Sequence, residues 1–164
     1  MIQRHVRLLL CRHTETDLNA QKRYSGARDD VPLNITGEMQ ADHLAETIST
    51  LPVTAIYSSD LLRTRQVASR VANRIGVSVV YDARLREVDI GQIGTMFKSE
   101  ARSKFPDEQF RTSSPCYDFR TIGGESRQQV IDRQLAAFEE ISAKYGRVDQ
   151  EKAPIVVVVG HGTA

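Results

Sequence analysis

Two of the four histidines follow apolar stretches of the sequence at equivalent points. His13 lies two residues beyond the apolar run 5–11, and His161 lies two residues beyond the run 154–159. If both runs are neighbouring parallel strands, their carboxyl ends meet at one edge of a sheet, where open α/β sheets bind their ligands. A single histidine at a strand end is more often structural, but two at equivalent positions favour a ligand site that contains both imidazoles.

The strands that would carry these histidines follow from the hydrophobic pattern. The run 5–11 predicts a buried first strand that ends abruptly in charged residues. The run 154–159 is almost entirely β-branched, which is typical of a central strand buried on both faces. Shorter apolar runs at 54–57 and 77–81 predict two further strands.

Apolar residues at helical spacing separate these strands. Thr36 is expected to be the N-cap of a helix with apolar residues at helical spacing, namely Met39, Ala41, Leu44, Ala45 and Ile48. Residues 58–60 offer hydroxyl and carboxylate caps to a second helix, which should end at Gly76.

The second half of the chain contains its longest irregular segment and its longest helix. Residues 85–124 are rich in glycine and proline, with one short helix expected at about 99–105, and they are a candidate lid over the site. Ser126 is expected to cap a long amphipathic helix that buries Leu135 and Ile141.

The order of these elements predicts an α/β fold, a three-layer α/β/α sandwich around a largely parallel sheet. A chain of 164 residues suits one core and is too short for two ordinary domains, so residues 1–164 are expected to form a single domain. The formal net charge of +1 argues against nucleic acid or an acidic membrane as a partner. No apolar run approaches the ~20 residues that span a bilayer, and no signal-peptide core is present, which indicates a cytoplasmic protein.

Five ordered parts of the sequence carry a family pattern. The first part begins with LCRHTET at 10–16 and continues through Asn19, RYSG and PLNITG. The other four parts are YSSDLLRTR at 57–65, LRE at 85–87, GES at 124–126 and VGHG at 159–162. In this order the segments resemble the histidine phosphatase superfamily, branch 1, also called the phosphoglycerate mutase-like superfamily. The resemblance covers nearly the whole chain.

The resemblance implies a role for each of these side chains. His13 would attack phosphorus as a neutral imidazole, a form that nearby positive charge favours. Glu87 would protonate the leaving oxygen and then activate water. The remaining implied site residues are the clamp Arg12, Arg63 and His161, with further phosphate or substrate contacts from Asn19, Ser25, Gly26 and Gly162. No metal and no cofactor are implied.

The implied function is hydrolysis of a small phosphorylated metabolite through a phosphohistidine. One alternative is a phosphoglycerate mutase, whose family members carry a longer insertion between the equivalents of Glu87 and Gly124. Another is a phosphate-binding module without catalysis. Glu125 has two interpretations, a catalytic carboxylate or a charge facing the positive end of its own helix. The sequence leaves the natural substrate and the oligomeric state open.

Three features depart from the family pattern, and one of them is residues 92–95, where QIGT replaces the usual tryptophan-acid-glycine pattern. Position 14 is threonine where the family usually has glycine, so its backbone has less conformational freedom. Family members also continue beyond the second His-Gly into another helix and strand, whereas this sequence stops at Ala164. We therefore expect a domain that is incomplete at its C-terminus and lacks that helix and strand.

Overall fold

The computed structural model describes residues 5–149, 151 and 153–162. Four parallel strands alternate with helices along the chain, as the sequence predicts. The elements are β1 (Arg7–Arg12), α1 (Asp17–Ala20), α2 (Ile35–Ile48), β2 (Val53–Ser58), α3 (Leu62–Ile75), β3 (Val79–Tyr81), α4 (Lys98–Lys104), α5 (Arg127–Tyr145) and β4 (Ile155–Gly160). Single 3₁₀ turns lie at Ala83–Leu85, Gly91–Ile93, Glu108–Phe110 and Arg120–Ile122.

The sheet has the strand order β1-β4-β2-β3, so the first and last strands are neighbours. Arg12 at the end of β1 lies opposite Gly160 at the end of β4, and the backbone N–H of His13 donates to the carbonyl of Gly160 at 3.0 Å. This register brings the two strand ends level. It confirms the prediction that two strands far apart in sequence deliver their histidines to one edge.

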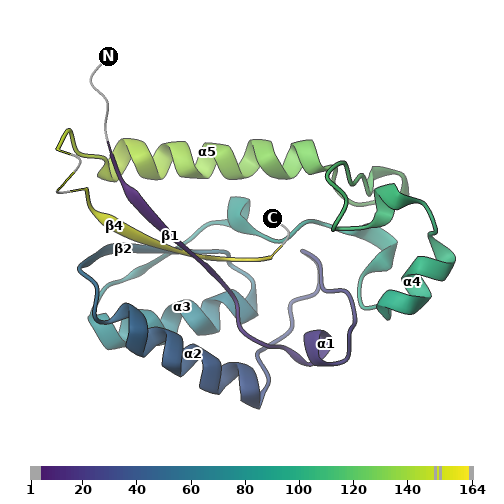
Figure 1. Ribbon diagram of the computed structural model, residues 1–164, viewed down its shortest axis with the longest axis horizontal. Coiled ribbons are helices and arrows are strands. Elements are labelled where there is room, and N and C mark those ends of the chain that lie inside the picture. Colours follow the sequence, from purple (N-terminus) through teal and green to yellow (C-terminus); the bar gives the residue numbers. More distant parts are fainter. Residues whose placement is uncertain (1–4, 150, 152, 163–164) are drawn as a thin grey trace.

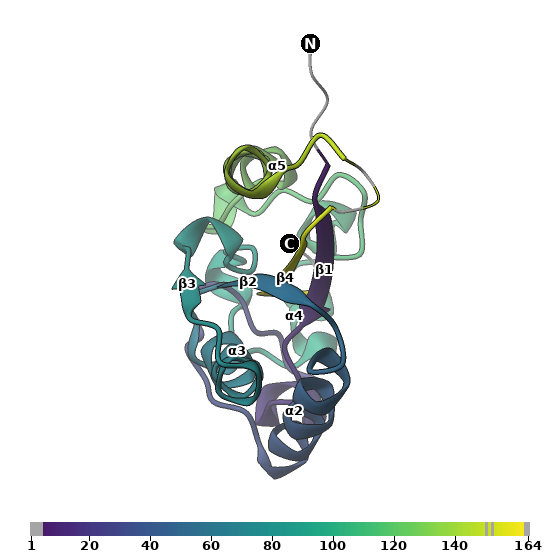
Figure 2. The same cartoon turned by 90° about the vertical axis from the view of Figure 1, so that its left-hand side faces the viewer.

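Helices cover both faces of the sheet and make three layers. Figures 1 and 2 show α2 and α3 on one face and α5 on the other. Alternate valines of β4 point to opposite faces, so that Val157 and Val159 join the core beneath α2 and α3, while Val156 and Val158 join the core beneath α5. All four are almost fully buried, which explains why the strand is a run of valines rather than an alternating pattern.

The irregular segment has a hydrophobic core of its own. Ile90, Ile93, Phe119 and Val130 are buried together there, so the segment packs against the start of α5. In Figure 1 its helix α4 lies beyond the ends of the strands, on the same side as the short helix α1. The segment therefore supplies a wall to this edge of the sheet; its movement as a lid stays a prediction.

The start of α2 differs from the prediction. Asn34 is the N-cap, with its side-chain oxygen accepting from the Gly37 N–H at 2.8 Å, and Thr36 lies inside the helix. Met39 is 60% exposed, because the buried stripe runs through Ala41 and Ala45 and position 39 lies on the opposite side. The prediction of Met39 as a core residue was wrong.

Two further helical predictions are corrected. Helix α3 has Leu61 at its N-cap, which offers no side-chain hydrogen bond, and the Leu62 N–H donates to the Asp30 carboxylate instead. Leu135 is 52% exposed, because α5 turns Ala137 toward the sheet instead. By contrast, Ser126 caps α5 as predicted, and Gly76 ends α3 in a left-handed conformation. No described helix is long and apolar enough to cross a membrane.

Candidate active site

The rings of His13 and His161 lie side by side at the carboxyl edge of the sheet. Their centroids are 5.3 Å apart, and the ring planes are inclined by 60°. Each ring follows the end of its strand directly, so the pairing of β1 with β4 fixes the distance between them. The sequence-based expectation that the two imidazoles are within reach of each other is confirmed.

His13 is 6% exposed and is held in one tautomer by the backbone. Its Nδ1 lies 2.7 Å from the carbonyl oxygen of Thr14. Because a carbonyl can only accept, Nδ1 carries the proton and the lone pair is on Nε2. Burial lowers the pKa of His13 to about 4, and the charges of Arg63 and Arg12 act in the same direction, against the hydrogen bond to Thr14. The ring is therefore neutral near pH 7, as a nucleophile must be.

Arg63 is fully buried in the first turn of α3. Its guanidinium donates to the carbonyl of Asp29 at 2.6 Å and to the carbonyl of Gly26 at 3.2 Å. Its Nε is also buried and has no hydrogen-bond partner in the part of the chain that the structure describes. Burial lowers its pKa, but a guanidinium remains charged in proteins. The result is an oriented cation close enough to affect both histidines.

His161 is held by Ser59, whose hydroxyl lies 2.9 Å from its Nε2. Its Nδ1 is buried without a partner among the described residues. Burial lowers the pKa of His161 to about 2, and the charge of Arg63 adds to the effect. The ring is thus neutral here, which differs from the cationic clamp that the resemblance implies. A neutral ring can still donate a hydrogen bond to an anion.

Arg12 is exposed at the end of β1, next to Gly162. A Cβ added to Gly162 would lie 2.9 Å from the Nε of Arg12, so this glycine leaves room for the arginine side chain. Arg12 lines a shallow pocket of about 230 Å³ with His13, and it also lines a smaller cavity of about 80 Å³ with Glu87. It therefore lies between the two groups that would perform the chemistry.

Glu87 is 7% exposed and lies just after the 3₁₀ turn Ala83–Leu85. Its Oε1 accepts from the N–H of Val88 at 3.0 Å. Glu87 lines the smaller cavity together with Ser25 and Asn19. The structure thus brings the predicted acid to the same edge of the sheet as the histidines.

The three predicted hydrogen-bonding residues have different surroundings. Ser25 has a buried hydroxyl with no partner among the described residues, in the wall of the smaller cavity. Asn19 uses its side-chain oxygen to accept from Thr16, although it lines both pockets. Gly26 donates its N–H to Asp29 at 2.8 Å and its carbonyl accepts from Arg63. Its visible role is to position the arginine, and a direct contact with phosphate stays a prediction.

Thr14 fits its position without strain. Lys22 and Thr95 are the only non-glycine residues with positive φ in the described chain, so position 14 does not need the conformational freedom of glycine. Its hydroxyl donates to the carbonyl of Gly37 at 2.7 Å, which ties the turn after β1 to the start of α2. The departure from the family pattern is therefore accommodated by ordinary backbone geometry and an added hydrogen bond.

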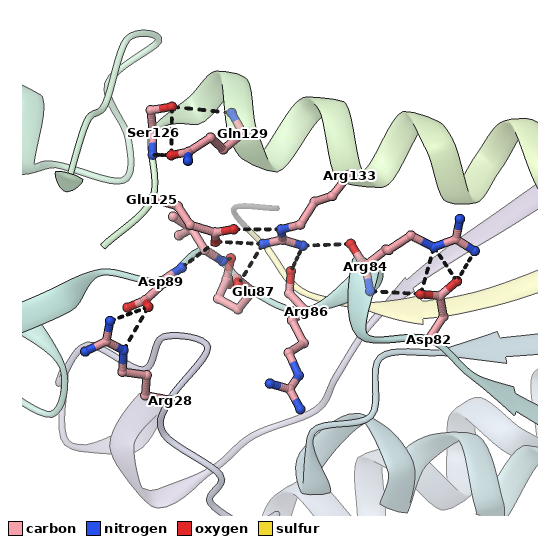
Figure 3. Close-up of polar contacts among 11 residues, drawn as sticks. Arg28, Asp82, Arg84, Arg86, Glu87, Asp89, Glu125, Ser126, Gln129 and Arg133 are labelled. Atoms are coloured by element: carbon pink, nitrogen blue, oxygen red, sulfur yellow. Dashed lines mark hydrogen bonds and ion pairs between the residues drawn. The ribbon is translucent and has the colours of Figure 1, made fainter. Parts of the chain in front are cut away.

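Sequence reasoning missed Arg133 and the contact of Ser59 with His161. Arg133 bonds to three carbonyls around Glu87 and to the carboxylate of Glu125 (Figure 3). Neither interpretation of Glu125 included this partner, which is eight residues away on α5. A signal was present, since Arg133 lies between Val130 and Ala137 on the buried side of the helix, where arginine is unusual without partners.

Known proteins resemble this chain in sequence and in fold. The model of the histidine phosphatase superfamily (branch 1) matches residues 8–164. Relatives named "Probable phosphoglycerate mutase GpmB" from Citrobacter koseri and Salmonella paratyphi A are each 35% identical, over 159 and 162 residues, and the match covers 97% of this chain and 71% of theirs.

Solved structures agree with this match. The mycobacterial glucosyl-3-phosphoglycerate phosphatase Rv2419c with VO3 superposes with a TM-score of 0.86 and 30% identity, covering 97% of this chain and 77% of that one. Bacillus stearothermophilus YhfR gives a TM-score of 0.79 and 29% identity, covering 95% and 74%. Sequence and fold therefore agree, and the chain belongs to the histidine phosphatase superfamily, branch 1.

Proposed function

We propose that this protein is a phosphomonoester hydrolase that works through a phosphohistidine on a small phosphorylated metabolite. The observation that carries the proposal is the state of His13, a buried neutral imidazole whose Nδ1 proton is held by Thr14 and whose Nε2 keeps its lone pair. The buried cation Arg63 beside it supports phosphate as the group under attack.

The reaction would proceed in two displacements. In the first, Nε2 of His13 attacks phosphorus, an N–P bond forms, the P–O bond to the substrate breaks, and Glu87 protonates the departing oxygen. In the second, water attacks phosphorus, Glu87 takes its proton, and the N–P bond breaks to release inorganic phosphate. Arg12, Arg63 and His161 would stabilise the negative charge on the transferring group, where most of the catalysis of phosphoryl transfer arises.

The substrate is expected to be anionic beyond its phosphate. The cavity beside Glu87 is also lined by Arg23 and Lys98, and Arg23 is fixed by a 2.7 Å hydrogen bond to the carbonyl of Thr95 and by stacking over Phe97. Two cations in the lining of a small cavity favour a compact metabolite with a further carboxylate or phosphate. The relative that acts on glucosyl-3-phosphoglycerate is consistent with this class.

A phosphoglycerate mutase is the second candidate, because the curated relatives at 35% identity bear that name. A mutase would use the same first displacement and then return the phosphoryl group to a hydroxyl of the substrate rather than to water. Incubation with 3-phosphoglycerate distinguishes the two. Hydrolysis releases inorganic phosphate, whereas a mutase yields 2-phosphoglycerate, and both products are resolved by ³¹P NMR.

The central experiment compares the parent with His13→Ala on para-nitrophenyl phosphate, with His43→Ala as a control that removes an exposed histidine of α2. We expect turnover by the parent and the control and none by His13→Ala. Equal turnover by His13→Ala would exclude it as the nucleophile. A parent that binds phosphate but shows no turnover would instead support the non-catalytic module.

The proposal includes independence from metal ions, because arginines already provide the positive charge around the phosphoryl group. Turnover should be unchanged after dialysis against a chelator, and its loss, restored by added metal, would contradict this. We also propose a cytoplasmic protein organised as one domain, as its length of 164 residues suggests, and without affinity for nucleic acid, as its near-zero net charge suggests. A gel-shift assay with duplex DNA and a single cooperative unfolding transition would test the last two points.

A further inference from the structure

The backbone around Glu87 has little regular structure to hold it. Residues 86–90 follow a single 3₁₀ turn and belong to no strand or helix. A general acid works only if its carboxyl group is held near the leaving oxygen, and a displacement of about 1 Å can reduce a rate ~100-fold. Some other part of the molecule must therefore fix this segment.

Arg133 of α5 provides that support. Its NH1 donates to the carbonyls of Arg84 and Arg86, both at 2.7 Å, and its NH2 donates to the carbonyl of Glu87 itself at 3.0 Å. Figure 3 shows the guanidinium reaching from the helix to these carbonyls. One side chain thus binds the backbone of the acid and of two residues that precede it, Arg84 and Arg86.

Glu125 completes the attachment on the other side of the acid. Its Oε1 accepts from the Nε of Arg133 at 2.9 Å, and its Oε2 accepts both from NH2 of Arg133 at 3.0 Å and from the N–H of Asp89 at 2.9 Å. Arg133 and Glu125 therefore bind the backbone on both sides of the acid: Arg133 binds carbonyls at and before Glu87, and Glu125 binds an amide after it. Both side chains are largely buried, at 19% and 25% exposure, so water competes weakly for these bonds.

The contacts require the planar fork of arginine. Five N–H groups in one plane reach a two-oxygen carboxylate on one edge and carbonyls on the others, which a lysine ammonium cannot do. Neighbouring arginines are engaged elsewhere: Arg84 pairs with Asp82 and Glu140, and Arg86 pairs with Asp60. Arg133 therefore donates the hydrogen bond to the carbonyl of Glu87, while Arg84 and Arg86 are held by other carboxylates.

We propose that Arg133 is a positioning residue for Glu87, and that Glu125 orients Arg133 for this purpose. The inference rests on the proposed role of Glu87 as the general acid. Arg133 does not act on the substrate itself. Its loss should therefore reproduce, in weaker form, the loss of the acid.

The test compares kcat/KM for two substrates, 2,4-dinitrophenyl phosphate and phenyl phosphate. The first has a leaving group that departs without a proton, whereas the second needs one. The value of kcat/KM depends only on the steps up to the transfer of the phosphoryl group to His13. It therefore reports the protonation of the leaving oxygen, even when the later release of phosphate limits kcat. Arg133→Met and Arg133→Lys are compared with Arg120→Met, which removes an exposed pair with Asp118.

We expect Arg133→Met to lower kcat/KM for phenyl phosphate by about 10- to 100-fold and for dinitrophenyl phosphate by less than about 3-fold. Arg133→Lys should show the same bias, and Arg120→Met should change neither value. Glu125→Gln serves if Arg133→Met does not fold, since it keeps an oxygen for Asp89 and weakens only the hold on Arg133.

Equal losses for both substrates would overturn the positioning role and leave a general structural one. Glu87→Gln separates this failure from failure of the proposed function. If Glu87→Gln shows the leaving-group bias and the Arg133 and Glu125 variants do not, the positioning role alone is wrong. If Glu87→Gln shows no bias, Glu87 is not the acid, and the positioning inference falls with it.

Discussion

The hydroxyl of Ser59 lies 2.9 Å from the Nε2 of His161 and joins the loop after β2 to the end of β4. This is the only hydrogen bond of the His161 ring within the described chain, since its Nδ1 has no partner. Ser59 therefore sets the orientation of the ring beside His13.

Ser59→Ala should free the ring of His161 and lower kcat/KM by about 10- to 100-fold, because a misplacement of about 1 Å in a site can cost ~100-fold in rate. Steady-state kinetics with para-nitrophenyl phosphate measures the effect, with the exposed Ser78→Ala as the control. Unchanged kinetics in Ser59→Ala would show that strand geometry alone orients the ring.

The two buried histidines should make stability depend on pH. Burial lowers the pKa of His13 to about 4 and that of His161 to about 2, whereas an unfolded histidine titrates near ~6.5. Below the unfolded pKa the unfolded chain binds more protons, so stability is present above about pH 6.5 and is lost as the pH falls toward the folded values. The loss between pH 7.5 and 5 should be about 1–2 kcal/mol for each histidine.

Urea unfolding at pH 7.5 and pH 5 tests this, with His161→Gln as the comparison. The variant should lose less stability than the parent over the same interval, while His43→Ala, which removes an exposed histidine, should behave like the parent. The same pH dependence in the parent and in His161→Gln would contradict the lowered pKa of His161.

Gly162→Ala should affect activity more than stability. The added Cβ would lie 2.9 Å from the Nε of Arg12, a flexible side chain that can move away, so the fold should keep its melting temperature while the arginine is displaced. We expect kcat/KM to fall by about 10-fold, because the proposed contact of Arg12 with phosphate depends on the orientation of its guanidinium. Gly160→Ala is the matched control, since a Cβ there meets no atom within 4 Å, and equal kinetics of the two variants would refute a role for the space beside Arg12.

Ser25→Ala should weaken phosphate binding without lowering the stability of the fold. The hydroxyl is buried without a partner in the described chain, so its removal should leave the free energy of unfolding unchanged or raise it by about 1 kcal/mol. If the hydroxyl contacts phosphate, inorganic phosphate should bind about 5- to 10-fold more weakly, since a hydrogen bond to a charged group contributes about 1.5 kcal/mol or more. Isothermal titration calorimetry and thermal melts measure the two effects, and unweakened binding would remove Ser25 from the site.

The architecture could be predicted because it depends on patterns that are local in sequence. An all-valine run indicates a strand buried on both faces, and β4 is such a strand between β1 and β2. Ser126 caps α5 with a hydrogen bond, and Gly76 ends α3 in a left-handed conformation. Both effects act within one turn of a helix, so the neighbouring sequence is enough to predict them. Met39 and Leu135 were predicted wrongly because apolar character does not say which side of a helix will face the sheet.

The sequence by itself determined the family, the strand-end positions of His13 and His161 and the set of candidate residues, because each rests on residue type and order. Only the tertiary structure decided how these residues are held. The contact of His161 with Ser59 and the attachment of Glu87 by Arg133 join residues 102 and 46 positions apart, and the tautomer of His13 depends on the orientation of the neighbouring Thr14 carbonyl. Burial and hydrogen bonding between such segments set pKa values and orientation, and neither is encoded in the spacing of residues along the chain.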